Sequence, residues 1–275
     1  MEFDTLARVW VYLTFNGSNP SLWEHPELLA VGMQWLLQQS HLCGRYLDFV
    51  EICSGTMVAS EAVVALGREA AQTDVAYSAE MDLSLLLGVL LAGFRILCSR
   101  RGALAWFSPE CSTWLNFMSR ATYGRSELAP GGDERLARNR RANACAHAIG
   151  QLIVLAALRG VYVLLEQPIN SLMLDYPSIA SALRIVAARR LCTHLGAFGG
   201  ISMKPLELWT TAGDAALALV RSRREALERL GDDALPLVRT DASGNVTGTA
   251  ALPASQAYPA DFAKEIADLV ERLRL

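Results

Sequence analysis

The sequence predicts an α/β fold, in which helices cover both faces of a mostly parallel β-sheet. Three observations support this prediction. From residue 46 onward, short apolar runs of strand length alternate with longer segments of helical periodicity. Polar and small residues follow these runs directly, at the sheet edge where ligands of such folds bind. No internal repeat or low-complexity tract competes with this interpretation.

Composition sets the limits of the fold. With 275 residues, 52% of them apolar, the chain can bury a substantial core as one large domain or two small ones. The net charge of −3 gives no basic signature of the kind that marks many nucleic-acid-binding proteins. The longest apolar stretch, residues 83–94, is too short to span a bilayer and is expected to form a buried helix.

The cysteines and the N-terminal residues predict an intracellular protein. The six cysteines form no CxxC pair and have no histidine partners at metal spacing, so we expect reduced thiols, no disulfide framework and no metal site. The first residues lack a basic region ahead of an apolar one, so no signal peptide is expected. A nuclear or organellar location fits equally well, and no membrane partner is expected.

Two parts of the chain are distinguished by their pattern. Residues 1–45 are expected to form an N-terminal helical extension that covers one face of the main fold and offers a surface to a partner protein. Residues 46–275 are expected to form the main α/β domain. Its strands are predicted at residues 46–53, 74–82, 103–108 and 161–166, and its helices at 57–67, 83–93 and 134–158.

The later segments are less regular. Residues 193–200 and 206–211 are predicted as a pair of strands, and residues 237–248 as a hairpin with its turn near Ser243. A final amphipathic helix follows residue 262. The Gly- and Pro-rich residues 129–133 are predicted to form a mobile loop.

The first two predicted strands carry residues typical of a nucleotide site. Glu51 ends the first strand, Gly55 allows a tight turn, and Glu80 near the end of the second can accept hydrogen bonds from ribose hydroxyls. Phosphate binding would require more glycines, so a nucleoside without a pyrophosphate, such as S-adenosylmethionine, fits better than NAD. An ordinary strand–turn–helix unit remains the alternative.

Two further strand ends carry reactive side chains. Cys111, in "FSPECSTW", follows the third strand in a turn, where a thiol is accessible; the alternative is an ordinary buried cysteine. Glu110 precedes it and is expected to raise the pKa of the thiol. Glu166, in "VLLEQPIN", stands at the exit of a buried strand, where a raised pKa suits proton donation; the alternative is a capping or paired carboxylate.

An arginine-rich segment follows the third strand and could contact nucleic-acid phosphates, although most charge runs are simply solvated. Its members are Arg120, Arg125, Arg135, Arg138, Arg140 and Arg141. Of these we take Arg120, Arg125, Arg138 and Arg141 as candidate substrate-binding residues.

In order, these segments resemble the motifs of the C5-cytosine methyltransferase family. "FVEICSGT", "YSAEMD", "SPECS", "LLEQP" and "SQAYPADF" are similar to its cofactor, nucleophile, acid and late cofactor motifs, and "HLGAFGGISMKPLELWTT" resembles a Lys-Pro segment of divergent members. The resemblance implies a Rossmann-like class I S-adenosylmethionine-dependent methyltransferase fold. It also implies a nucleic-acid substrate, DNA or RNA.

The resemblance also implies roles for individual residues. Cys111 would be the nucleophile and Glu166 the acid. The cofactor residues would be Glu51, Cys53, Gly55, Thr56, Glu80 for the ribose, Met81 against the adenine, Ser255 and Gln256. The chain differs from the family pattern at Glu110, where the family has proline, and in the short stretch between residues 211 and 255. A degenerate member without activity, serving as a structural or nucleic-acid-binding subunit, is therefore the alternative function.

Overall fold

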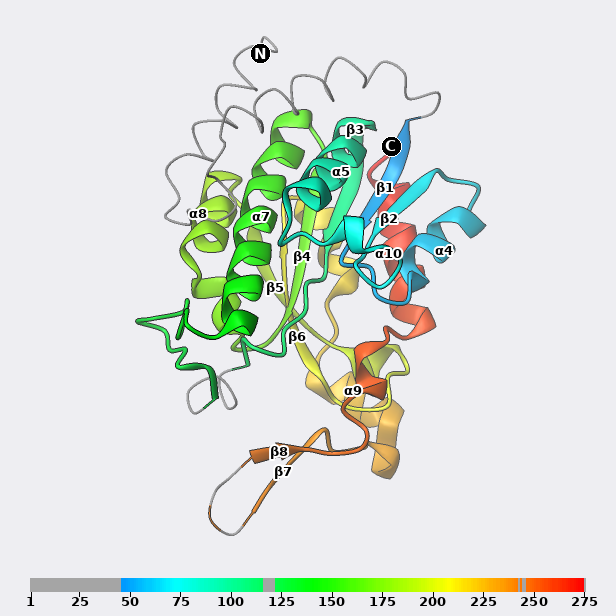
Figure 1. Cartoon of the computed structure of the whole chain (residues 1–275). Helices are drawn as coiled ribbons and strands as arrows, with labels where there is room; N and C mark the ends of the chain where they lie inside the picture. Colours follow the sequence, from blue (N-terminus) through cyan, green and yellow to red (C-terminus); the bar gives the residue numbers. More distant parts are fainter. Residues whose placement is uncertain (1–45, 116–121, 242, 244–245, 275) are drawn as a thin grey trace.

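A six-stranded mixed sheet forms the centre of the protein (Figure 1). The computed structural model describes residues 46–115, 122–241, 243 and 246–274, so the predicted N-terminal extension lies outside the described residues. The sheet strands are β1 (Leu47–Ile52), β2 (Ala70–Thr73), β3 (Ser99–Phe107), β4 (Tyr162–Pro168), β5 (Arg189–His194) and β6 (Pro205–Thr210). The described residues therefore confirm an α/β fold, and its sheet is compatible with a Rossmann-like architecture.

The strand order is β2-β1-β3-β4-β6-β5. β2, β3 and β4 run parallel to β1, whereas β6 pairs antiparallel with both β4 and β5. The order along the sheet reverses between β1 and β3. Ligands of open α/β sheets bind beyond the strand ends at such a switch point, so this edge is where a site is expected.

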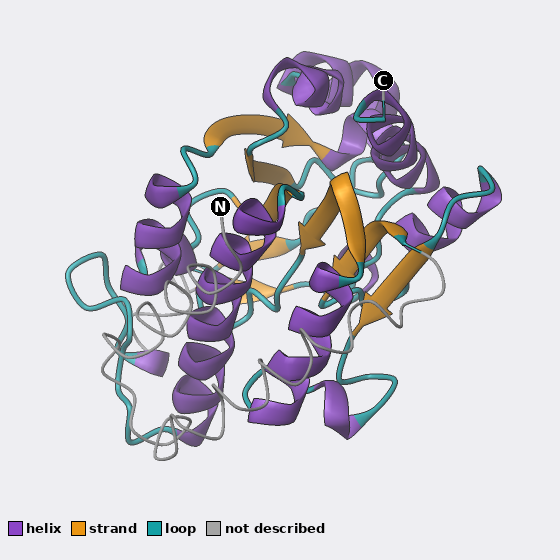
Figure 2. Ribbon diagram, turned by 90° about the horizontal axis from the view of Figure 1, so that it is seen from above, coloured by secondary structure: helices purple, strands orange, loops and turns teal. Residues whose placement is uncertain are grey.

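Helices cover both faces of the sheet, as seen from above in Figure 2. They are α4 (Val58–Ala65), α5 (Leu86–Leu97), α7 (Ala137–Arg159), α8 (Pro177–Ile185), α9 (Arg223–Leu230) and α10 (Ala260–Arg272). One apolar core joins β1, β3 and β4 to α5, α7 and α8, and the other joins the opposite face to α4 and α10. This two-layer covering explains why the strands have almost continuous apolar sequences.

The strand predicted at residues 74–82 is wrong. The strand beside β1 is Ala70–Thr73, paired in register with Val50↔Ala71 and Ile52↔Thr73. Ala and Gln are weak strand formers, so parallel pairing with β1 decides the conformation here rather than propensity. Asp74 then begins a turn, because its carboxylate accepts the backbone N–H of Ala76 (2.8 Å).

The strand predicted at residues 193–200 is also largely wrong, since β5 ends at His194 and Leu195–Phe198 form a 3₁₀ turn that Gly199 terminates at φ 83°. The hairpin is confirmed: β7 (Val238–Thr240) pairs antiparallel with β8 (Val246–Gly248) and projects from the body of the protein (Figure 1). The final amphipathic helix is confirmed as α10.

The predicted loop at residues 129–133 is a loop, but its backbone is fastened to α7. The side chains of Asn139 and Asn143 donate to the carbonyls of Asp133 (2.9 Å) and Gly131 (3.0 Å). Gly132 has φ 65°, and a Cβ there would lie 2.5 Å from a backbone oxygen. Glycine is therefore required to form this fixed turn.

Two further expectations concern α7 and the cysteines. α7 is long and apolar enough to cross a membrane by length and composition, and 72% of its most apolar stretch is buried in the protein, as in the core helix of a globular fold. Free thiols are present at Cys53, Cys111, Cys145 and Cys192. Cys98 is disulfide-bonded, so the expectation of reduced thiols is wrong at that position.

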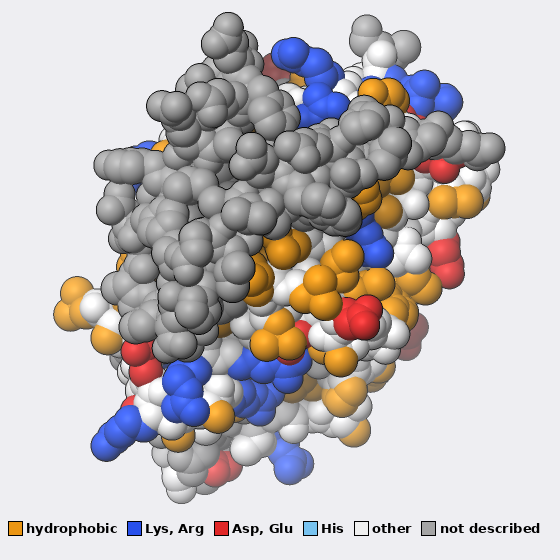
Figure 3. Space-filling view, turned by 45° about the horizontal axis from the view of Figure 1, so that its top comes forward, with side chains coloured by type: hydrophobic (Ala, Val, Ile, Leu, Met, Phe, Trp, Pro, Cys, Tyr) orange, Lys and Arg blue, Asp and Glu red, His pale blue; other side chains and the backbone are white. Residues whose placement is uncertain are grey.

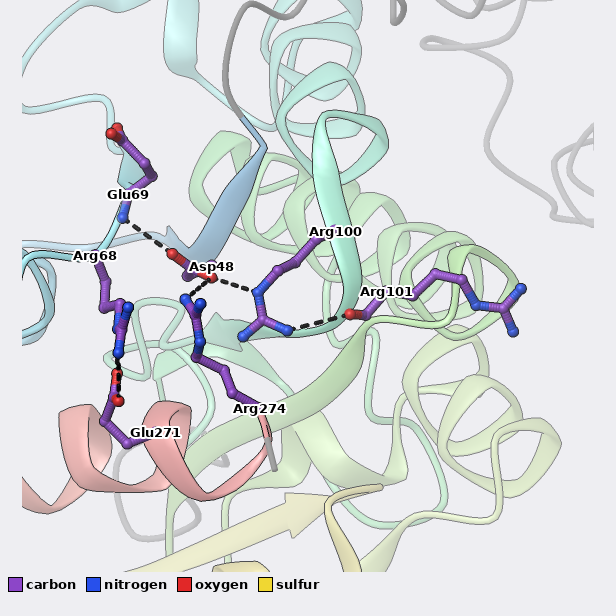
Figure 4. A network of polar contacts seen from close by, with 7 residues as sticks. All are labelled: Asp48, Arg68, Glu69, Arg100, Arg101, Glu271 and Arg274. Carbon is purple, nitrogen blue, oxygen red and sulfur yellow. Dashed lines mark hydrogen bonds and ion pairs between the residues drawn. The ribbon is translucent and has the colours of Figure 1, made fainter.

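A polar network closes the edge of the sheet where β1 begins (Figure 4). Asp48 is 5% exposed and accepts hydrogen bonds from Arg100, from Arg274 (2.7 Å) and from the backbone N–H of Glu69 (3.2 Å). Burial alone would raise the pKa of Asp48, but these donors and the two positive charges hold that pKa below its usual value. The network joins the end of α10 to β1 and β3.

Candidate functional site

Cys111 lies in the loop after β3, and this loop is fastened to the neighbouring strands. The Ser108 hydroxyl donates to the carbonyl of Cys53 just after β1 (2.9 Å). On the other side, the buried Gln167 amide of β4 donates to the carbonyl of Pro109 (3.0 Å). The loop that carries the thiol is therefore held at the switch point between β1 and β3.

The Cys111 thiol is half-buried, and its pKa is raised to about 11. Burial is the main cause and the negative charge of Glu166 the next, while the positive charge of Lys204 opposes them. The expected effect of Glu110 is present but is the smallest of these, because Glu110 is exposed and contacts Ser112 and Arg138.

Glu166 of β4 reaches the same site. It is 4% exposed and faces the side of the sheet covered by α10, as Leu164 does two residues earlier. Tyr258 donates a hydrogen bond to Oε2, whereas Oε1 is buried and has no hydrogen-bond partner among the described residues. Burial raises the pKa of Glu166, although Lys204 and Tyr258 both oppose the shift. The expected raised pKa is confirmed.

Lys204 and Tyr258 are site residues that the sequence analysis did not single out, although they lie in the Lys-Pro segment and in the late cofactor motif of the resemblance. Lys204 precedes β6, and its Nζ donates to the carbonyl of Ser255 (3.1 Å) and lies 6.0 Å from the centre of the Tyr258 ring. Tyr258 precedes α10 and packs against Trp106 with ring centroids 4.8 Å apart. Besides these two motifs, the sequence shows that Lys204 is one of only two lysines in the chain.

These contacts place Ser255 beside Lys204 at the acid end of the site. Ser255 is 5% exposed and its hydroxyl donates to the carbonyl of Leu252 (2.8 Å). Gln256 is exposed. The contact printed for Ser255 is therefore with Lys204, and the role at the cofactor end that the resemblance implied for Ser255 and Gln256 stays a prediction.

A second cluster lies at the ends of β1 and β2. Glu51 is fully buried, and its Oε2 accepts hydrogen bonds from the Ser60 backbone N–H (2.9 Å) and hydroxyl (2.5 Å). Burial raises the pKa of Glu51 to about 7 against these two donors. Glu51 Oε1 lacks a hydrogen-bond partner within the part of the chain that the structure describes, whereas the side chain of Ser54 lies within hydrogen-bonding reach of Tyr77. Buried polar atoms are normally satisfied, so this free carboxyl oxygen marks a place for a polar ligand.

The loop between β1 and α4 is held against the turn after β2. The Gly55 N–H donates to Asp74 Oδ2 (2.9 Å), and the Tyr77 hydroxyl donates to the Gly55 carbonyl. Cys53 and Met57, at φ 61° and 59°, adopt the left-handed conformation that non-glycine residues rarely take. Such strain collects at functional sites, which agrees with a role for this loop.

The strand-end acid of β2 is Asp74 and not Glu80. Glu80 lies in the 3₁₀ turn Ala79–Met81, seven residues after the strand ends, and is exposed. Met81 is partly buried and Thr56 is exposed. The thiol of Cys53 contacts that of Cys145, which with burial raises the pKa of Cys53 well above its usual value. Of the predicted cofactor residues, the structure brings Glu51, Cys53 and Gly55 together.

Arg125 is wrong as a substrate-binding residue. It is 1% exposed, its guanidinium lies 3.6 Å from the centre of the Trp114 ring, and it donates to Pro130 O (2.6 Å) and Asn143 Oδ1 (2.9 Å). These contacts make it a core residue that fixes the loop after Cys111. Arg120 lies outside the described residues.

Arg138 and Arg141 are accessible, with 58% and 57% of their side chains exposed. Arg138 donates to the Ser112 hydroxyl (2.9 Å), one residue from Cys111, and Arg141 pairs with Asp82 (3.0 Å). Lys and Arg side chains form several separate groups on the face shown in Figure 3. The two arginines therefore offer local contacts near the site.

A hollow of about 880 Å³ lies on the other face of the sheet. Trp209 and Glu207 of β6, Asp175 and Leu183 are among its lining residues, whereas Cys111 and Glu166 do not line it. The candidate reactive residues therefore lie at the strand ends and outside this hollow.

Together, the described residues form two adjoining clusters. One pairs a thiol with a buried carboxyl that has a free oxygen, an arrangement suited to nucleophilic addition with proton donation. The other offers the free Glu51 oxygen beside a strained loop, an arrangement suited to a polar nucleoside ligand. The chain matches no family model, no curated protein and no solved structure.

Proposed function

We propose that the protein is an S-adenosylmethionine-dependent methyltransferase that acts on C5 of cytosine in DNA or RNA through a covalent bond to Cys111. The observation that carries this proposal is the pairing of Cys111 with Glu166. The two groups lie close enough that the charge of Glu166 raises the pKa of the thiol, and one buried oxygen of Glu166 has no hydrogen-bond partner among the described residues.

The chemistry assigned to this pair is conventional for a thiol and a carboxylic acid. The Cys111 thiolate would add to C6 of a flipped-out cytosine, while Glu166 donates its proton to N3 of the ring. S-adenosylmethionine, when bound, would supply the methyl group that C5 accepts. Transfer of the C5 proton to a solvent water and cleavage of the S–C6 bond would then release the Cys111 thiolate, and N3 would return its proton to Glu166.

The raised pKa values of the pair fit this sequence of steps. At neutral pH the Cys111 thiol is mostly protonated, and the charge of Glu166 contributes to this. A proton on Glu166 removes that contribution, so the state of Glu166 that can donate a proton is also the state in which the thiolate forms more readily.

The cluster at β1 and β2 fits S-adenosylmethionine. This cofactor carries positive charges on its ammonium and sulfonium groups, and the cluster offers Glu51 Oε1 as an acceptor without a partner among the described residues. Gly55 is the only glycine of the loop, which agrees with a ligand that has no pyrophosphate. Asp74, at the end of β2, takes the role for ribose hydroxyls that the sequence had given to Glu80, since each carboxylate oxygen retains a free lone pair.

The alternative function is a non-catalytic protein of the same fold that binds a nucleic acid or a partner. The observation that favours it is the pKa of about 11 at Cys111, which leaves little thiolate in the free protein.

Two measurements test the proposal. Isothermal titration calorimetry should detect S-adenosylmethionine binding, and its absence would contradict the cofactor assignment. DNA and RNA that contain 5-fluorocytosine should form a stable covalent adduct with the protein in the presence of S-adenosylmethionine. Cys111→Ser should abolish the adduct, and Cys192→Ser, at an exposed free thiol, serves as the matched control. Cofactor binding with no adduct on either nucleic acid would establish the non-catalytic alternative.

A further inference from the structure

Tyr258 and Glu166 are 92 residues apart in sequence and meet in the site. The Tyr258 hydroxyl donates to Glu166 Oε2. The ring is held by aromatic neighbours, with centroid distances of 4.8 Å to Trp106 and 5.5 Å to Phe262. The hydroxyl is thus presented to the carboxyl by a packed core and not by a mobile side chain.

We propose that Tyr258 is the positioning residue of Glu166: its hydroxyl occupies Oε2 and thereby makes Oε1 the oxygen that carries and delivers the proton. This inference rests on the proposed role of Glu166 as a proton donor. It gives a role to Tyr258, which neither the sequence nor the proposed reaction had assigned.

The direction of the hydrogen bond supports this role. An oxygen that accepts from a hydroxyl uses a lone pair for the bond, so the neutral acid carries its proton on the other oxygen. That other oxygen, Oε1, is buried and has no partner among the described side chains. Burial and the nearby charge of Glu166 raise the pKa of Tyr258 well above its usual value, so Tyr258 remains a neutral donor over the working pH range.

Several other groups around Glu166 are charged or can titrate, and they influence its pKa or that of Tyr258. Lys204, before β6, lowers the pKa of Glu166, as Tyr258 does, whereas burial raises it. Cys111 faces Glu166 from the loop after β3. Ser108, in the same loop, hydrogen-bonds Tyr258 and lowers its pKa. Of these groups, Tyr258 is the uncharged one that donates a hydrogen bond to the Glu166 carboxyl.

The test is an infrared titration of the Glu166 carboxyl in the full-length protein without substrate. The band of the protonated acid is assigned by its loss in Glu166→Gln. In Tyr258→Phe the carboxylate loses a charge-assisted hydrogen bond, so the titration midpoint should rise by roughly 1–2 pH units. Tyr162→Phe makes the same chemical change at the start of the same strand and should leave the midpoint unchanged. An unchanged midpoint in Tyr258→Phe would overturn the proposal.

A second variant keeps the test decisive should Tyr258→Phe fail to fold. Tyr258→3-fluorotyrosine retains the ring and the hydroxyl but makes the phenol more acidic and a stronger donor. The Glu166 midpoint should then fall, because a stronger hydrogen bond favours the charged carboxylate. A midpoint that stays constant or rises would contradict the positioning role.

The titration also separates this inference from the proposed function, since it requires no methyl transfer. A shifted midpoint in a protein that forms no adduct would leave the positioning role intact and reject the reaction. Where methyl transfer is measured, Tyr258→Phe should lower kcat with little change in KM for the nucleic acid, and the high-pH limb of the kcat profile should move upward with the infrared midpoint. Parallel losses in Tyr258→Phe and Tyr162→Phe would instead indicate a purely structural effect and overturn the proposal.

Discussion

The two ends of β1 each bury a carboxyl group, and the two are satisfied in opposite ways. Asp48 is 5% exposed and accepts hydrogen bonds from two arginines and a backbone N–H, and its pKa lies below the usual value. Glu51 is fully buried, and among the described residues it accepts hydrogen bonds only from the uncharged Ser60 and keeps one oxygen without a partner; its pKa is raised to about 7.

This difference separates a structural carboxylate from a candidate functional one. Burial is the largest influence on the pKa of both groups, so burial alone does not mark a site. What differs is the countercharge: Asp48 is neutralised by Arg100 and Arg274, whereas Glu51 and Glu166 each keep one oxygen that no described residue hydrogen-bonds. A buried acid with a free oxygen is therefore the more informative signal of function.

Of the substitutions that test this contrast, Glu51→Gln should have the largest effect. The expected effect is a change in how the free energy of unfolding depends on pH. Because the folded state raises the pKa of Glu51 from 4.5 to about 7, its contribution to stability is complete below pH 4.5 and is lost as the pH rises through 7. The wild type should therefore lose about 3 kcal/mol of unfolding free energy, relative to Glu51→Gln, between about pH 4 and pH 8. Urea unfolding of both proteins at these two pH values measures this difference.

All other titrating groups contribute equally to the pH dependence of stability in the wild type and in the variant, so the difference between the two proteins reports Glu51 alone. Glu228→Gln, at a 64% exposed side chain on α9, is the matched control and should follow the wild type at both pH values. Parallel curves for the wild type and Glu51→Gln would show that Glu51 is ionised in the folded protein and would remove the contrast with Asp48.

Asp48→Asn should lower the free energy of unfolding at neutral pH by a smaller amount, and its pH dependence should have the opposite sign. At neutral pH it removes charge-assisted hydrogen bonds from Arg100 and Arg274 and leaves their charges without a partner, at a cost of about 2 kcal/mol. The stabilisation by Asp48 is present above its unfolded pKa of 3.8 and is lost as the pH falls through the lower folded value. Asp214→Asn, in an exposed pair with Arg189, should change stability by less than about 0.5 kcal/mol. Cofactor binding should be unaffected by Asp48→Asn, and its loss would contradict a purely structural role.

The smallest expected effect on stability concerns the arginines at the opposite edge from Asp48. Arg138→Gln and Arg141→Gln should each change the unfolding free energy by less than about 0.5 kcal/mol, because more than half of each side chain is exposed. Each should lower the salt dependence of nucleic-acid binding by about one phosphate contact, measured as the slope of log affinity against log salt. Arg189→Gln, 55% exposed at the start of β5, is the control. An equal decrease in that control would place the nucleic acid elsewhere.

The sequence predicted the fold class because periodicity reports burial directly. The apolar runs at β1, β3 and β4 and the long helix α7 were recognised, since each is buried on both sides or along much of its length. β2 was missed because its four residues are Ala, Ala, Gln and Thr, which take strand conformation only through pairing with β1. Tertiary pairing of this kind leaves no periodic signal in the local sequence.

For the site, the sequence indicated residues whose position follows from a strand end and missed those that come from elsewhere. Cys111 and Glu166 both follow apolar runs, and the charge of Glu166 raises the pKa of the Cys111 thiol. Tyr258 reaches Glu166 across 92 residues, which no local pattern encodes. Arg125 was grouped with exposed arginines because its burial depends on Trp114 and Asn143, which local sequence does not reveal.

The antiparallel direction of β6 determines which of its flanking residues reach the site edge of the sheet. In parallel strands, residues that serve the switch-point edge stand after the strand; in β6 they stand before it, as Lys204 does ahead of Pro205. The residues that follow β6 in the sequence lie at the opposite edge, so a comparison of the residues after each strand omits Lys204. For mixed sheets, the residues on the N-terminal side of the reversed strand belong in the same comparison, and in this chain they supply the positive charge that faces both the thiol and the acid.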